Sequence, residues 1–235
     1  MYSTPKKISL PLPYILLLLA LSFIPGPVAG QIVTDESISK EWLRENLQPQ
    51  TPRLIFTNEV EQLLRSKLEA DPSVQRLYQH IKTSADYYLE QPPLTYQKKG
   101  RRLLRVSRNA LQRMLALAMA SRIEQDSKYL KRLEAELLTV THFPDWNPSH
   151  FLDAAEMATA VGLALDWCGQ DMDAEVLRVA KRALLEKAIK PSLGITWENW
   201  WWVSEHNWNL VCHGGLAIAA LAVFLSLFHK TMKHK

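Results

Sequence analysis

The sequence predicts an all-α fold made of antiparallel helical hairpins, and three observations support this prediction. From Thr34 onward, apolar residues recur at the three- and four-residue spacing of a helix. No stretch shows the sustained two-residue alternation that a half-buried strand requires. The predicted helices are about 12 to 20 residues long and are joined by short links, which suits a bundle, a solenoid or a closed α/α toroid.

The first two predicted helices have recognisable starts. Asn58 is a candidate N-cap, because its side chain can accept a hydrogen bond from a free N–H of the first turn. Asp71 followed by Pro72 indicates the start of a second helix, since proline is well tolerated in the first turn. This helix is expected to run to Glu90, shortly before two consecutive prolines.

The middle of the chain predicts four further helices, over residues 104–124, 126–140, 151–167 and 173–190. Asp126 and Asp173 stand at the starts of two of them as N-caps. Pro191 is expected to end the last of the four, because proline has no N–H and clashes with the preceding turn.

The first 30 residues predict a secretory signal peptide. Lys6 and Lys7 precede the apolar run 14–24, and small residues follow up to Gly30. The apolar run is shorter than the roughly 20 residues of a transmembrane helix. We therefore expect cleavage after Gly30, a mature chain over 31–235, and a periplasmic or secreted protein.

Composition and charge exclude several classes of protein. A chain of 235 residues that is 47% hydrophobic and 22% charged, with 13 Pro and 2 Cys, is neither disordered nor a disulfide scaffold. Without the signal peptide, 26 Lys and Arg face 24 Asp and Glu, a balance that does not favour nucleic-acid binding. Cys168 and Cys212 lack metal or redox spacing, and no histidine pair has the spacing of a zinc helix. We expect no metal and no other cofactor.

Two links, residues 142–150 and 197–213, are rich in aromatic and polar side chains rather than in turn residues. Five of the eight tryptophans lie between Trp197 and Trp208. Each indole has a wide apolar face and one N–H to satisfy, so indoles beside amides suit a sugar ring, although they can also wedge between helices as core. We interpret the cluster as a carbohydrate-binding site.

Three segments together resemble the N-terminal α/α toroid of heparinase II/III-type polysaccharide lyases. They are PRLIF at 52–56, DWNPSHFLD at 145–153, and the stretch from Asn199 to Asn209. The resemblance covers about Arg53 to Leu221 and implies an incomplete (α/α) toroid over 31–235. It also implies an enzyme that cleaves uronic-acid-containing polysaccharides by β-elimination, with an acidic polysaccharide as its partner.

Some catalytic residues and one domain of the family have no counterpart in this sequence. In the family, a catalytic tyrosine lies further along the toroid and a following β-sheet domain supplies a catalytic histidine. No tyrosine follows Tyr129 here, and an apolar segment followed by lysines closes the chain at Lys235. We therefore expect a truncated lyase that is inactive as this chain alone.

β-Elimination predicts the roles of the site residues. The proton next to the uronate carboxylate is a very weak acid, so the enzyme must neutralise that carboxylate while a base and an acid move protons. The resemblance places neutralisation on Asn207, with His206 as a second catalytic candidate, although Asn207 could also cap a helix. The candidate substrate-binding residues are Trp146, Asn147, His150, Asn199, Trp200, Trp201 and Asn209.

Other interpretations remain open at this stage. An α/α-barrel glycoside hydrolase would use a pair of carboxylates drawn from Asp145, Asp153, Glu156, Glu198 and Glu205. A non-catalytic carbohydrate-binding or scaffold protein would need no acid or base. The apolar run Leu210–Phe228 is long enough for a membrane tether, although two glycines interrupt it.

The one notable cluster of charge is basic. It comprises Lys98, Lys99, Arg101, Arg102, Arg105 and Arg108. The cluster could attract an acidic polysaccharide, or it could be the solvated start of a helix.

Overall fold

The computed structural model describes residues 51–193 and 197–232, and within these ranges the chain is helical. The elements are α3 (Asn58–Ala70), α4 (Pro72–Leu89), α5 (Leu104–Glu124), α6 (Ser127–Thr141), η2 (Pro148–His150), α7 (Phe151–Cys168), α8 (Ala174–Leu184), η3 (Leu185–Ile189), α9 (Lys190–Ser192), η4 (Trp197–Val203) and α10 (Asn207–Met232). The all-α prediction is confirmed for the described residues. The predicted signal peptide, 1–30, lies outside them and stays a prediction.

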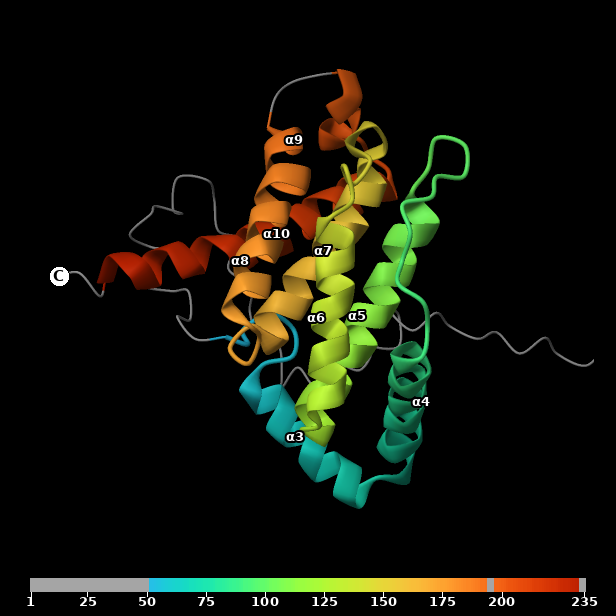
Figure 1. Ribbon diagram of the computed structural model, residues 1–235, viewed down its shortest axis with the longest axis vertical. Helices are drawn as coiled ribbons and strands as arrows, with labels where there is room; N and C mark the ends of the chain where they lie inside the picture. Colours follow the sequence, from blue (N-terminus) through green and yellow to red (C-terminus); the bar gives the residue numbers. More distant parts are fainter. Residues whose placement is uncertain (1–50, 194–196, 233–235) are drawn as a thin grey trace, which may run out of the picture.

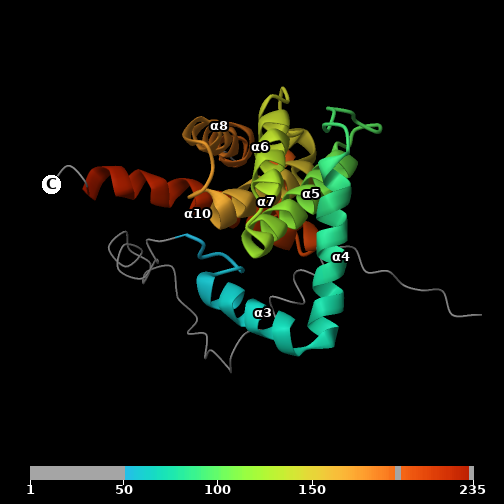
Figure 2. The same ribbon diagram turned by 60° about the horizontal axis from the view of Figure 1, so that its bottom comes forward.

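Helix α7 lies at the centre of the molecule. It packs against α5 and α10, with α6 and α8 also in contact, while α4 lies along α5 (Figure 1). Helix α3 crosses the end of the molecule at which α4 begins, and the last turns of α10 extend beyond the other helices (Figures 1 and 2). This arrangement consists of packed hairpins; whether it forms part of a toroid stays a prediction.

The composition of α7 explains its central position. Sixteen of its 18 residues are buried, so it is apolar on all sides and requires neighbours on all sides. Glycines let α10 come close to it. A Cβ on Gly215 would lie 2.9 Å from the carbonyl carbon of Ala155 in α7, and closer still to its oxygen. A Cβ on Gly162 would meet the side chain of Ile218 at 2.7 Å. The α7–α10 contact therefore depends on the absence of side chains at these two positions.

The predicted aspartate caps are confirmed. Asp71, Asp126 and Asp173 each accept a hydrogen bond from a backbone N–H in the first turn of α4, α6 and α8, respectively. The prediction for the first helix is wrong by one residue, because Thr57 is the N-cap of α3. Asn58 is instead the first helical residue, and its side chain accepts a hydrogen bond from Arg122.

The prediction that Pro191 ends its helix is also wrong by one residue, because the helix ends at Ser192. Helices α8, η3 and α9 follow one another without a break, and Pro191 lies inside the last of them. The segment η3 is a π-helix, in which the N–H of Lys190 bonds to the carbonyl of Leu185, five residues back. This wider turn precedes the proline, where the usual hydrogen-bond ladder cannot continue because proline has no N–H.

The segment that resembles the start of the lyase toroid has a structural role. The backbone N–H groups of Arg53 and Leu54 donate to one carboxylate oxygen of Asp166, at 2.9 and 2.8 Å. The indole N–H of Trp167 in turn donates a hydrogen bond to the carbonyl of Leu54. These bonds hold the start of the described chain against α7, and burial raises the pKa of Asp166 despite the bonds it accepts.

The two cysteines provide a test of how tightly α7 and α10 pack. Cys168 and Cys212 are both buried free thiols, and burial raises the pKa of each to about 12. A thiol reacts as its thiolate, so we expect neither cysteine to react with a maleimide at neutral pH while the protein is folded. Mass spectrometry of labelled protein at increasing urea concentrations measures this.

The expected result is that both thiols become labelled together as the far-ultraviolet circular dichroism is lost. Rapid labelling of Cys212 in native buffer, with circular dichroism unchanged, would contradict the packing of α10 described above.

Among the residues that the structure describes, no helix combines the length and the apolar character that crossing a bilayer requires. The end of the predicted tether Leu210–Phe228, after Val223, has side chains that lie outside the described residues, so the tether stays a prediction.

Candidate functional site

His150 is held in a fixed orientation at the start of α7. Its Nδ1 lies 2.8 Å from one carboxylate oxygen of Asp153, and the other oxygen accepts from the N–H of Leu103 and the amide of Asn147, both at 2.6 Å. Asp153 is fully buried, so these bonds replace its contacts with water. Because a carboxylate only accepts, Nδ1 carries a hydrogen, and in the tautomer with that single hydrogen Nε2 is an acceptor.

The free nitrogen of His150 is the most notable atom of this region. Nε2 is buried and has no hydrogen-bond partner within the described part of the chain. The imidazole ring meets the indole of Trp208 edge to face, with 4.6 Å between centroids. An imidazole fixed in this way can accept a hydrogen bond or a proton from any group that reaches the buried Nε2.

The sequence predicted His150 as a binding residue but did not identify Asp153 as the residue that orients it. The available signal was that Asp153 follows His150 by three residues, a spacing that brings two side chains close together on a helical turn.

The tryptophans divide into a buried set and an exposed set. Trp201 is fully buried and stacks on Phe151, with centroids 4.5 Å apart and 21° between the planes. Trp200 and Trp202 are 47% and 44% exposed. Trp208 lies between Trp200 and His150 and contacts both. Trp201 therefore belongs to the core, whereas the neighbouring rings on either side offer faces to a ligand.

Four other predicted substrate-binding residues form bonds inside the protein. Trp146 is fully buried and its indole N–H donates to the carbonyl of Val140. The three asparagine side chains donate to backbone carbonyls, Asn147 to that of Arg101, Asn199 to that of Ser192 and Asn209 to that of Trp202. These bonds maintain the shape of the two aromatic links, and Trp146 presents no face to solvent.

The two catalytic candidates lie at the start of α10. Asn207 is its first residue and His206 precedes it, and both are exposed. In the described structure neither side chain forms a hydrogen bond, so both are available to a ligand. The first-turn N–H groups of a helix lack partners within the helix and favour an anion. Trp208, the next residue, links this helix end to His150.

The carboxylates proposed for glycoside hydrolysis are mostly engaged. Asp153 holds His150, and Asp145 accepts from the hydroxyl of Tyr96 at 2.6 Å. Glu156 pairs with Arg108 at 3.1 Å, and burial raises its pKa. Glu205 is exposed, and the Glu198 side chain lies outside the described residues. The described arrangement therefore does not supply two free carboxyl groups, as hydrolysis requires.

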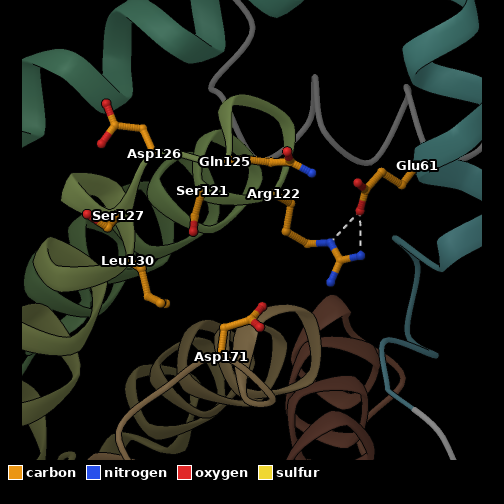
Figure 3. A pocket seen from close by; sticks show the side chains of 8 residues that line it. All are labelled: Glu61, Ser121, Arg122, Gln125, Asp126, Ser127, Leu130 and Asp171. Atoms are coloured by element: carbon orange, nitrogen blue, oxygen red, sulfur yellow. Dashed lines mark hydrogen bonds and ion pairs between the residues drawn. The ribbon is translucent and has the colours of Figure 1, made fainter.

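The cavity in Figure 3, about 370 Å³ in volume, lies at the opposite end of α5 from Asp153. Its arginine, Arg122, points toward Glu61 and bonds to it at 2.5 Å, and it also donates to the carbonyl of Trp167. The guanidinium of Arg122, in α5, therefore bonds to both α3 and α7. Its hydrogen bonds stabilise the packing of these three helices, so we assign this cavity no ligand. Within 51–193 and 197–232, no group of three or more His, Cys, Asp and Glu is placed to hold a metal ion.

Comparison with known proteins does not assign the chain to a family. No protein-family model matches the sequence, and a search of curated proteins finds no significant match. The resemblance to heparinase II/III-type lyases rests on the three segments described above.

Proposed function

We propose that the protein binds uronic-acid-containing polysaccharide where α7 and α10 begin, and that it acts on this polysaccharide as a β-eliminating lyase. This proposal departs from the expectation that the chain alone is inactive, because His150 can accept a proton in place of the missing tyrosine. The observation that carries the proposal is the grouping at this end. Exposed Asn207 opens α10, Trp208 follows it, and Trp208 packs on His150, whose Nε2 has no partner in the described structure. The resemblance to lyase toroids supports the assignment of the reaction.

The geometry suits the first requirement of the reaction, which is neutralisation of the uronate carboxylate. The amide of Asn207 and the free N–H groups at the start of α10 can donate to the two carboxylate oxygens. A donor placed before the reaction stabilises the negative charge that moves onto the carboxylate as the neighbouring C–H bond breaks. The exposed rings of Trp200 and Trp202 supply apolar faces for the C–H faces of sugar units.

His150 is suited to a second role near the sugar. Its Nε2 can accept a proton or a hydrogen bond because Asp153 holds the hydrogen on Nδ1. The products of elimination are a carbon–carbon double bond conjugated to the carboxylate and a free hydroxyl on the departing sugar. The base takes the proton from carbon, and an acid must return one to the departing oxygen.

A non-catalytic saccharide-binding protein is the second candidate function. The observation that favours it is that the exposed tryptophan rings and Asn207 are sufficient to bind a sugar chain without any proton transfer.

The test of the proposal is an elimination assay with the full chain on a panel of uronate polymers, followed by the ultraviolet absorbance of the conjugated double bond. Asn207→Ala is expected to lower kcat/KM about 100-fold, as removal of a donor to a developing anion does. Asn207→Asp keeps the size and shape of the side chain but places a negative charge against the carboxylate, so it should be equally inactive. Both variants should melt at the temperature of the wild type.

The outcomes separate the two candidate functions. Unchanged elimination by both variants would overturn the role of Asn207. Wild-type protein that changes its tryptophan fluorescence with uronate oligomers, loses this response in Trp200→Ala, and produces no double bond is a binding protein. Absence of both binding and elimination would overturn both candidates.

A further inference from the structure

A second concave surface lies between the end of α4 and the first half of α5. It is a groove of about 640 Å³, within the range of about 300–1,000 Å³ that is usual for ligand sites. The residues that line it are Tyr87, Tyr88, Gln91, Leu104, Arg105, Arg108, Asn109, Gln112 and Arg113. The lining contains three arginines and no carboxylate, so the groove favours an anionic ligand.

The three arginines differ in how far their charge is already neutralised. Arg113 is buried and pairs with Glu136 at 2.8 Å, and Arg108 pairs with Glu156 at 3.1 Å. Arg105 is exposed and donates to the side-chain oxygen of Gln97, at 3.2 Å. Among the described residues, no carboxylate lies within ion-pair distance of Arg105. Arg105 is therefore the cation in the groove whose charge is left for a ligand.

The groove also contains two tyrosine rings, of which one is exposed. Tyr87 is 60% exposed, and its ring meets that of Tyr88 at 5.6 Å with 61° between the planes. Tyr88 is held from the other side by the guanidinium of Arg113, 5.7 Å from its ring centre. The groove thus has one anchored ring and one ring free to receive a flat apolar surface.

These groups together match one ligand chemistry. A tyrosine face stacks on the C–H face of a sugar, and the amides of Gln91 and Gln112 can pair with hydroxyl groups. A guanidinium presents two parallel N–H donors, which fit a carboxylate or a sulfate ester. A nucleic acid would need a broader basic surface than one free arginine.

We propose that the groove between α4 and α5 is a second saccharide subsite, in which Arg105 binds an anionic substituent and Tyr87 stacks on the sugar ring. The inference rests on the proposed function in one respect, because it takes the same acidic polysaccharide as the ligand. The groove is joined to the first site through Arg108, which lines it and pairs with Glu156 of α7, three residues beyond Asp153.

The test is isothermal titration calorimetry of the full chain with a sulfated uronate oligosaccharide of defined length and with the same oligosaccharide after chemical desulfation. Arg105→Gln and Tyr87→Ala are each expected to weaken binding of the sulfated form about tenfold. The matched control is Arg182→Gln, which removes an exposed arginine of α8 that lies outside the groove and lowers the net charge equally. It should change the affinity less than twofold.

The results distinguish this subsite from the site at Trp200. Equal weakening by Arg105→Gln and Arg182→Gln would overturn the subsite, since only net charge would then matter. Loss of binding in Tyr87→Ala and Arg105→Gln, with no elimination by any form of the protein, would support the groove while overturning the lyase. Elimination that depends on Asn207, together with groove variants of unchanged affinity, would support the lyase and overturn the groove.

Discussion

Replacing Gly215 by alanine is expected to lower the free energy of unfolding by about 3 kcal/mol, because the new methyl group would overlap the backbone of α7. The atoms that it would meet are the carbonyl group and Cα of Ala155, at 2.9 Å for the carbonyl carbon. Backbone atoms inside a helix cannot swing away as the end of a side chain can. The two helices must therefore separate, and the contact between the most buried helix and α10 becomes looser.

The neighbouring residue provides the matched control for this prediction. A Cβ on Gly214 would meet nothing within 4 Å. Gly214→Ala should raise the stability by about 0.5 to 1 kcal/mol, because alanine favours the helix over glycine. Urea denaturation followed by circular dichroism measures both variants. Equal effects of the two substitutions would show that α10 does not pack on α7 through Gly215.

Replacing Asp153 by alanine is expected to cost about 4 kcal/mol, since it leaves three buried donors without an acceptor. These donors are Nδ1 of His150, the N–H of Leu103 and the amide of Asn147. The substitution also releases the imidazole, so saccharide affinity should fall together with stability. Thermal unfolding and tryptophan fluorescence titration measure the two effects.

His150→Ala is the comparison that separates orientation from stability. The Asp153 carboxylate keeps two of its partners in this variant, so the loss of stability should be about 1 to 2 kcal/mol. Nitrogen NMR of the His150 ring provides an independent readout, with the hydrogen on Nδ1 in the wild type and spread over both nitrogens in Asp153→Asn. If Asp153→Ala were no less stable than His150→Ala, the proposed support of the imidazole would be wrong.

The helix starts could be predicted from the sequence because capping is local chemistry. Asp71, Asp126 and Asp173 each need only a free N–H two or three residues away. The helix runs one residue past Pro191, and it contains a π-helical turn before the proline that the sequence did not predict. The π-helical turn depends on how the whole helix packs, and no rule based on neighbouring residues contains that information.

The candidate site was predictable in composition but not in detail. The sequence placed the tryptophans together, yet only the structure shows that Trp201 stacks on Phe151 while Trp200 remains open. The basic cluster that leads into the first turns of α5 was visible in the sequence as a possible contact for acidic polysaccharide. Whether Arg105 has a carboxylate partner depends on the packing of α4 against α5, which the sequence pattern does not determine.

The π-helical turn η3 also bears on how this protein could have changed during evolution. A π turn holds one more residue than an α-helical turn, so it marks a place where a single residue can be gained within a helix. Deleting one residue from η3 would rotate the following residues by about 100° about the helix axis. The carbonyl of Ser192, which accepts the amide of Asn199, would then point elsewhere. The extra residue in η3 therefore determines where the Ser192 carbonyl points. Through its hydrogen bond to Asn199, it also helps to position the segment that carries Trp200 and Trp202.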